Sequence, residues 1–203
     1  MSTVVPVVLA DLIPLPRSIS RNRLRDVVLV VGGALFTAIA AQIVVHLGFT
    51  PVPLTGQTFA VLVVSAVLGS RRAVASQFLY WALGAIGLPF YADAQGGWQK
   101  ASGATAGYFV GFMLAAWVIG RFADKRETQN FMASLSSMTL GTAIIYVCGT
   151  LWLAHSLNIP VANGDTNAIK LGVEPFLVGD AVKMLIAASI APLGWVAYYS
   201  KPQ

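Results

Sequence analysis

Six apolar stretches, separated by short segments rich in glycine, proline or charge, constrain the fold of this 203-residue chain more than any other feature. Because 57% of the residues are hydrophobic and only 10% are charged, these stretches are too many and too long for one water-soluble core. We therefore predict an all-α membrane protein with six transmembrane helices. The expected spans are residues 27–47, 58–69, 73–88, 104–120, 131–157 and 175–199.

The basic residues predict the orientation of the spans. If both termini are cytoplasmic, ten of the thirteen Lys and Arg residues fall in inner segments, and only Lys100 and Lys170 fall in outer loops. This distribution follows the positive-inside rule. The thirteenth, Lys183, lies inside the sixth stretch. The expected organisation is a cytoplasmic segment over residues 1–26, a membrane domain over residues 27–199 and a cytoplasmic tail over residues 200–203.

The net charge of +5 does not indicate a nucleic-acid partner, because the basic residues form no stripe with interleaved aromatics. The sequence also has no Gly-x-x-x-x-Gly-Lys-Ser/Thr loop for nucleotide phosphates. It has no His-Glu-x-x-His motif and only one cysteine, which argues against a metal-centred site. Ser65, Ser76 and Ser189 have no catalytic partner in the pattern, and we expect their hydroxyls to bond to their own helices.

Asp180 and Lys183 are the two ionisable residues of the sixth stretch. Such groups cost roughly 2.5–3.5 kcal/mol each at bilayer depth, so they persist where they pair, reach water or bind a ligand. A spacing of three places both on one face of a helix. Two interpretations follow: a structural ion pair between helices, or a polar anchor for a small and mostly apolar ligand.

Other candidate residues lie at the outer ends of the expected spans. The outer loop at residues 91–102 carries Trp98, which is either an apolar lid or a headgroup anchor. Gln57 precedes the second span and is either a ligand-binding amide or a helix-start residue. Tyr108 is either an aromatic wall with a hydroxyl or an interface aromatic. On the expected topology these residues lie near the outer side of the membrane, at about the same depth as Asp180 and Lys183.

Three segments, read together, match a known pattern. Residues 52–59 read Val-Pro-Leu-Thr-Gly-Gln-Thr-Phe, residues 83–92 read Leu-Gly-Ala-Ile-Gly-Leu-Pro-Phe-Tyr-Ala, and residues 175–183 read Pro-Phe-Leu-Val-Gly-Asp-Ala-Val-Lys. In this order, on a six-span chain, they resemble the BioY family. That family supplies the biotin-binding S subunit of energy-coupling-factor (ECF) transporters, and the resemblance extends over about residues 27–199.

The resemblance implies the ECF S-component fold and a function in biotin uptake. The chain would capture biotin from outside and release it inside, in a bacterial plasma (inner) membrane, with ATP hydrolysed by partner chains. It implies a transmembrane coupling subunit, ATP-binding subunits and membrane lipid as partners, with biotin as ligand, no cofactor and no enzymatic activity. The implied biotin-binding residues are Gln57, Trp98, Thr105, Gly107, Tyr108, Asp180 and Lys183.

The sequence departs from the family pattern at one place. Residues 103–108 read Gly-Ala-Thr-Ala-Gly-Tyr where the family typically has Gly-Pro-Thr-Gly-Gly-Tyr, so Ala104 and Ala106 replace Pro and Gly. Alanine keeps a close approach but disfavours positive backbone angles, so we expect an effect on affinity rather than on ligand class.

Ala34 and Ala38 form a small-residue step in the first span, where small side chains let helices approach closely. Such a step serves packing inside the chain or docking to a partner. The family's Ala-x-x-x-Ala motif faces the coupling subunit, so the resemblance implies docking.

Two functions from other classes stay open. A small intramembrane hydrolase would use Asp180 as an acid or base and would turn over a substrate. A structural or assembly subunit would use Asp180 and Lys183 only to hold two helices together and would bind no vitamin.

Overall fold

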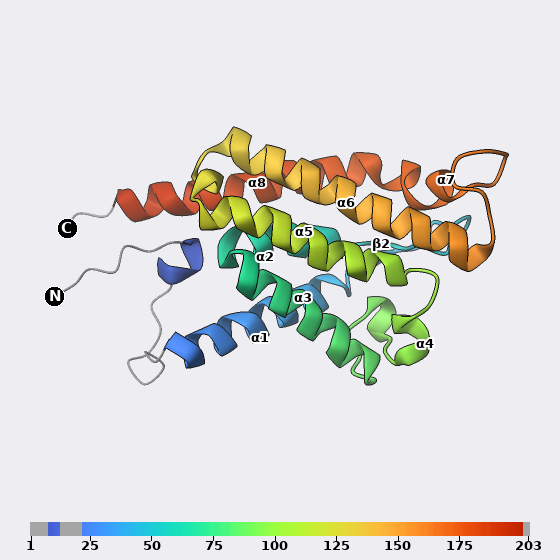
Figure 1. Cartoon of the computed structure of the whole chain (residues 1–203), viewed down its shortest axis with the longest axis horizontal. Helices are drawn as coiled ribbons and strands as arrows, with labels where there is room; N and C mark the ends of the chain where they lie inside the picture. The colour runs from blue at the N-terminus through green and yellow to red at the C-terminus, as the bar shows by residue number, and fades with distance from the viewer. Residues whose placement is uncertain (1–7, 13–21, 201–203) are drawn as a thin grey trace.

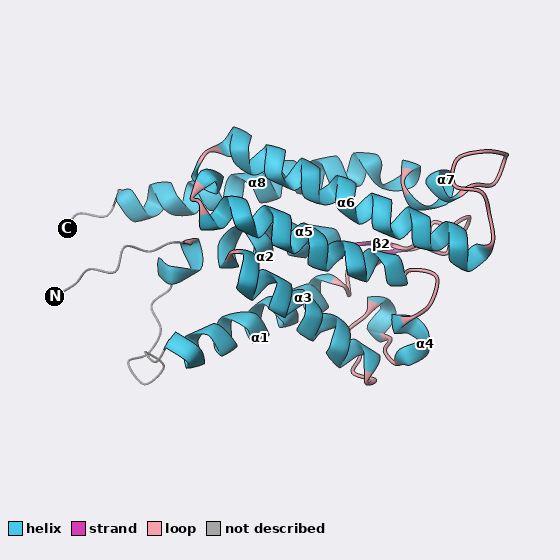
Figure 2. Ribbon diagram, viewed as in Figure 1, coloured by secondary structure: helices cyan, strands magenta, loops and turns pink. Residues whose placement is uncertain are grey.

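The computed structural model describes residues 8–12 and 22–200. In these residues six helices of at least twelve residues form one bundle, and each corresponds to one apolar stretch of the sequence (Figure 2). The prediction of a helical protein is confirmed. The six helices are α1 (Asn22–Ala40), α2 (Gln57–Leu68), α3 (Ser70–Ala85), α5 (Ala106–Asp124), α6 (Phe131–Leu157) and α8 (Leu177–Tyr199).

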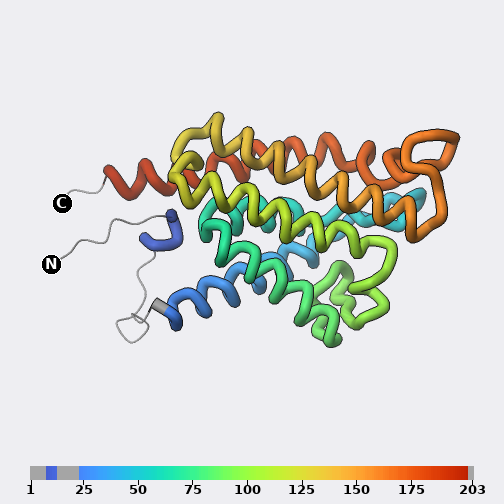
Figure 3. Tube along the Cα trace, viewed as in Figure 1, coloured from blue at the N-terminus to red at the C-terminus, as the bar shows by residue number. Residues whose placement is uncertain are grey.

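The helices lie roughly along one long axis (Figure 1). Helix α5 packs along α6 and also contacts α2 and α3, while α1 lies against α3 and α8 lies against α2 and α6. In the tube view α6 and α8 run together along one side of the molecule, and α1 and α3 lie on the other side (Figure 3). Helix α1 begins at the same end of the molecule at which α8 ends (Figure 1).

The short elements gather at the two ends of the bundle. Strands β1 (Val44–Val45) and β2 (Leu54–Thr55) pair antiparallel, with Val44 opposite Thr55. They lie at the end where α8 begins, together with α4 and α7 (Figure 1). The remaining short helices are η1 (Leu9–Leu12), η3 (Ala92–Ala94), α4 (Trp98–Ala101), η4 (Glu127–Gln129), α7 (Ala168–Gly172) and η5 (Glu174–Phe176).

The prediction for the first span was too long. Helix α1 ends at Ala40, whereas the apolar stretch continues to residue 47 and contains β1. Gln42 explains the boundary, because its amide nitrogen donates to the carbonyl of Tyr91 at 3.2 Å and its amide oxygen accepts from the backbone N–H of Ala94 at 2.9 Å. The chain after α1 is thereby tied to the loop that follows α3.

Helices α2 and α3 are short, with 12 and 16 residues, as the lengths of their apolar stretches predict. They meet at Gly69, whose φ of +78° favours glycine. The carboxylate of Asp124, at the end of α5, accepts hydrogen bonds from the backbone N–H and the hydroxyl of Ser70. A carboxylate at the first turn of α3 satisfies a backbone N–H that has no partner within the helix, and its negative charge interacts favourably with the helix dipole.

The short helix η1 is held against the end of the bundle opposite α4. Arg72 lies 2.8 Å from Asp11 and 2.7 Å from Asp26, and Arg25 donates to the carbonyl of Ala10 at 2.7 Å. Ala10 is fully buried. Of the predicted cytoplasmic segment over residues 1–26, only residues 8–12 and 22–26 are described, and Arg17, Arg21 and Lys201 lie outside the described residues.

Three helical segments in the described residues are long and apolar enough to cross a membrane: Ala106–Asp124, Phe131–Leu157 and the continuous segment Ala168–Tyr199. Large apolar side chains are exposed along their outer faces, such as Val147 on α6 and Val178 and Leu193 on α8. Exposed apolar faces of this extent are typical of contact with lipid or another chain.

Ala34 and Ala38 are only 1% and 7% exposed, and both belong to the hydrophobic core of the bundle. A Cβ added at the neighbouring Gly33 would lie 2.6 Å from the hydroxyl of Ser76, so α1 approaches α3 closely along this stripe. The burial of both alanines favours packing inside the chain over docking to a coupling subunit. The sequence pattern alone left both interpretations open.

Candidate functional site

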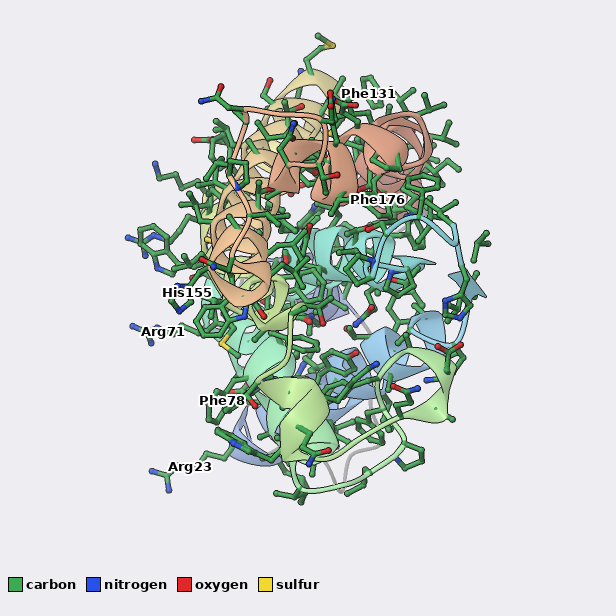
Figure 4. The ribbon with its side chains drawn as sticks, turned by 90° about the vertical axis from the view of Figure 1, so that its right-hand side faces the viewer. Arg23, Arg71, Phe78, Phe131, His155 and Phe176 are labelled. Atoms are coloured by element: carbon green, nitrogen blue, oxygen red, sulfur yellow. The ribbon has the colours of Figure 1, made fainter. Side chains whose placement is uncertain are left out.

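A cavity of about 260 Å³ lies at the end of the bundle where α8 begins. It is lined by residues of α2, α5, α6 and α8 and by the loops around β1, β2 and α4. Five of the predicted site residues line this cavity: Gln57, Thr105, Tyr108, Asp180 and Lys183. Seen from this end, Phe176 lies toward the inside of the bundle, whereas Arg23 and Arg71 project away from it (Figure 4).

Asp180 and Lys183 form an ion pair at the inner part of the cavity. Nζ of Lys183 lies 2.8 Å from Oδ1 of Asp180, and the side chains are 20% and 7% exposed, respectively. Nζ also donates to the carbonyl of Thr55 at 2.7 Å and to the hydroxyl of Thr58 at 3.2 Å. An ammonium has three donors, so all three are used in this arrangement.

The Asp180 carboxylate has two further partners that the sequence analysis missed. The hydroxyl of Thr58 donates to Oδ1 at 3.0 Å, and the hydroxyl of Tyr146 donates to Oδ2 at 2.7 Å. Thr58 directly follows Gln57, and Tyr146 is a polar aromatic near the middle of the apolar α6. A lone Tyr in a long apolar span was the available signal for the second residue, because a buried phenol usually finds a hydrogen-bond partner.

Gln57 begins α2, but its side chain points away from the helix backbone. Its amide nitrogen donates to the hydroxyl of Tyr80 at 2.6 Å, and its amide oxygen accepts from the hydroxyl of Thr55 at 2.9 Å. Gln57 is 9% exposed and Tyr80 is fully buried. Gln57 is thus a helix-start residue by position, but its amide bonds to other side chains and not to the backbone of α2. One of the two amide N–H donors has no partner in the described residues.

Tyr108 is held as a cavity wall rather than at the surface. It is 9% exposed, and its hydroxyl donates to the carbonyl of Gly172 at 2.8 Å. A Cβ at Gly149 would lie 2.3 Å from the Tyr108 ring, so α6 and the ring approach closely. Thr105 precedes α5 and lines the same cavity.

Aromatic side chains form much of the apolar wall. The rings of Tyr91 and Phe109 have centroids 4.8 Å apart, and Phe112 and Phe176 also line the cavity. Burial raises the pKa of the Tyr91 phenol to about 12. The group therefore stays protonated, and it donates to the carbonyl of Trp81 at 2.6 Å. The cavity thus combines an apolar wall with a polar inner end.

Trp98 and Gly107 do not line this cavity. Trp98 is 64% exposed and packs edge-on against Trp81, with ring centroids 6.3 Å apart, beside a separate apolar groove. Its position favours a headgroup anchor over a lid. At Gly107 a Cβ would lie 2.3 Å from Cβ of Trp152 and 2.4 Å from the carbonyl oxygen of Cys148. Gly107 therefore allows close contact between α5 and α6.

The site offers hydrogen bonding rather than nucleophilic chemistry. Ser65, Ser76 and Ser189 each donate to a carbonyl four residues earlier in their own helices, which confirms their expected structural role. No cluster of three or more His, Cys, Asp or Glu side chains is placed to hold a metal ion in the part of the chain that the structure describes. Asp180 and Tyr146 can accept a ligand N–H, and Gln57 can donate to a ligand carbonyl.

A bundle of apolar helices with a small, aromatic-walled cavity and a buried ion pair is typical of a membrane protein that binds a small ligand. The sequence matches the BioY family over residues 15–200. The chain belongs to this family.

Relatives support this assignment. The chain is 39% identical over 163 residues to the biotin transporter BioY of Thermotoga maritima, which covers 77% of this chain and 89% of the relative. It is 36% identical over 167 residues to the probable biotin transporter BioY of Pyrococcus horikoshii. This match covers 82% of this chain and 94% of the relative. These names are those of transporters rather than of enzymes.

The fold is also similar to a solved structure, the S-component for biotin from an ECF-type ABC transporter. The TM-score is 0.76 at 24% sequence identity, and the match covers 89% of this chain and 94% of the other. This similarity shows that the chain has the S-component fold.

Proposed function

We propose that this chain is the biotin-binding S component of an ECF transporter and is not itself an enzyme. Biotin has a fused ureido ring, a sulfur-containing ring and a valerate tail that ends in a carboxylate. Such a ligand needs donors and acceptors at one place and apolar walls beside them. The cavity between α2, α5, α6 and α8 provides both.

The polar cluster around Asp180 carries this proposal. Its Oδ2 accepts one hydrogen bond, from Tyr146, and a carboxylate oxygen can accept a second one. A ureido N–H can fill that position without breaking the Asp180–Lys183 pair. The free N–H of Gln57 can donate to the ureido oxygen. The inner end of the cavity thus suits a neutral, urea-like group.

The apolar part of biotin would lie against the wall formed by Tyr108, Phe109 and Phe112, with Thr105 nearby. Burying such a ligand removes apolar surface from water, which is favourable by about 25 cal/mol per Å² before the costs of binding are subtracted. Aromatic walls also hold a flat bicyclic ring in one orientation.

In this proposal α1, α2, α3, α5, α6 and α8 all span the plasma (inner) membrane of a bacterial cell, with both termini in the cytoplasm. Two features support the topology: the even number of helices of at least twelve residues in the described part of the chain, and the start of α1 and the end of α8 at one end of the molecule. Arg71, Arg72 and Arg121 lie at helix ends on that side, as the positive-inside rule expects. The cavity then opens to the outside. The exposed apolar faces would contact lipid.

The proposal also includes partner chains, a transmembrane coupling subunit and ATP-binding subunits, which would energise uptake. Two observations support it: the S-component fold and the sequence, which contains no phosphate-binding loop of its own. The exposed apolar side chains of α1, such as Leu35, Phe36 and Ile39, offer a contact surface that the buried Ala34 and Ala38 do not.

Titration calorimetry of biotin into the purified full chain in detergent tests the proposal. We expect saturable binding with one biotin per chain, and a large loss of affinity for Asp180→Asn, because the carboxylate then becomes a weaker acceptor. The matched control is Asp165→Asn in the exposed loop before α7. Absence of saturable binding would favour the structural subunit, and turnover of a substrate would favour the hydrolase. Competition with dethiobiotin would test the role of the sulfur ring.

A further inference from the structure

The two ends of the cavity differ in charge and exposure. At the inner end Asp180 is 6% exposed, and its charge is balanced by Lys183. At the mouth, three charged or titratable residues line the cavity: His46, Asp93 and Lys100. All three are exposed. The mouth is therefore the part of the cavity where a charged group of a ligand keeps access to water.

Lys100 is the uncommitted cation at this mouth. Among the residues that the structure describes, its ammonium has no hydrogen-bond or ion-pair partner. His46 and Asp93, in contrast, bond to each other, with Nε2 of His46 3.1 Å from Oδ1 of Asp93. The other outer lysine, Lys170 on α7, donates to the carbonyl of Asp165 at 3.2 Å and does not line the cavity.

The local fold holds Lys100 in place. The backbone N–H of Gly97, just before α4, donates to the carbonyl of Gly84 at 2.7 Å, which ties α4 to the end of α3. Trp98 packs against Trp81 beside the separate apolar groove. Within one turn of α4, Trp98 therefore lines the groove while Lys100 lines the cavity. A second tie, from the backbone N–H of Ala94 to the amide oxygen of Gln42 at 2.9 Å, holds the segment that carries Asp93.

A ligand carboxylate at the mouth meets two opposite influences. The Asp93 carboxylate repels it, and the Lys100 ammonium attracts it and has donors to spare. The inner end provides no equivalent, because the three donors of Lys183 are already used and its charge is balanced by Asp180.

From this arrangement we infer that Lys100 is a specificity-determining residue that binds the carboxylate of the ligand at the mouth, with the neutral ring at Asp180. The inference rests on the proposed function, because it assumes that biotin is the ligand. Biotin would then lie with its carboxylate at Lys100 and its ureido ring at Asp180. The chain would then prefer biotin over derivatives in which the carboxylate is esterified or amidated.

The test compares biotin with biotin methyl ester, which keeps both rings and loses only the tail charge. Binding of each is measured by titration calorimetry to the full chain, to Lys100→Gln and to the control Lys170→Gln. We expect Lys100→Gln to weaken biotin binding about tenfold and to leave ester binding unchanged. Lys170→Gln should change neither. Higher salt should weaken biotin binding to the unmodified chain more than ester binding.

The outcomes separate the two proposals. If the unmodified chain binds neither compound, the proposed function fails and the orientation fails with it. If biotin binds but Lys100→Gln binds it equally well, the proposed function stands and the role of Lys100 is refuted. An equal loss for biotin and ester would make Lys100 a structural residue and would also refute the inference.

Discussion

The hydroxyl of Tyr146 on α6 donates to Oδ2 of Asp180 on α8 over 2.7 Å. The two residues are 34 positions apart in the sequence and come from helices that pack side by side. This hydrogen bond orients the carboxylate toward the cavity, which both residues line. The position of the proposed ligand acceptor therefore depends on a second helix as well as on α8.

Tyr146→Phe should weaken biotin binding about tenfold. The substitution keeps the ring but removes the donor to Asp180, and a hydrogen bond to a charged group contributes about 1.5 kcal/mol. Titration calorimetry measures the change. Tyr199→Phe, at an exposed position near the end of α8, is the control and should bind normally. Unchanged affinity in Tyr146→Phe would remove this residue from the site.

Separate and joint substitution of the ion pair should distinguish stability from binding. Asp180→Asn or Lys183→Met alone should lower the free energy of unfolding by about 3 kcal/mol, because each leaves a poorly compensated charge or donor in a mostly buried site. The double variant should regain much of that stability, since no unpaired charge remains. Thermal unfolding in detergent measures the stability of each variant.

Biotin binding to the same double variant gives the complementary measurement. We expect binding to stay weak even where stability returns, because the Asn amide oxygen is a weaker acceptor for the ligand N–H than the Asp180 carboxylate. A stable double variant that binds biotin normally would mean that the pair only holds helices together.

Ala34→Trp should destabilise the bundle by about 2 kcal/mol or more and should abolish biotin binding in detergent. The side chain is 1% exposed in the core, and a large ring there forces α1 away from its neighbours. The control is Ile39→Trp on the same helix, where the side chain is 68% exposed. Thermal unfolding without partner chains provides the measurement. A stable Ala34→Trp variant that loses only transport would restore the docking interpretation.

Gly107→Ala should destabilise the protein by about 1–3 kcal/mol, because the new methyl group collides with the backbone of α6 and cannot be accommodated by a side-chain rotation. The control is Gly32→Ala in α1, where an added Cβ meets nothing within 4 Å. That change should be neutral or slightly stabilising, since alanine favours the helix. If the two variants unfold at the same temperature, Gly107 is not a packing residue.

Several features were predictable from the sequence because their physical cause is local. The six helices of the bundle follow from apolar stretches bounded by polar residues, glycine and proline. Asp180 and Lys183 stood out because ionisable groups are costly in apolar surroundings. Gln57 and Tyr108 stood out through their place at the outer ends of the expected spans together with the resemblance to a family. The first span was predicted too long because β1 is as apolar as a helix in this chain.

Other features depend on how each helix is rotated about its own axis, and only the tertiary structure decides that. In a water-soluble protein a polar stripe marks the outer face of a helix, but lipid and protein core are equally apolar, so the pattern of α1 or α6 does not reveal which side faces inward. The structure turns Ala34 and Ala38 into the core, Tyr146 toward Asp180 and Trp98 away from the cavity. The sequence by itself determined which residues are costly to bury, whereas helix packing decided which of them meet.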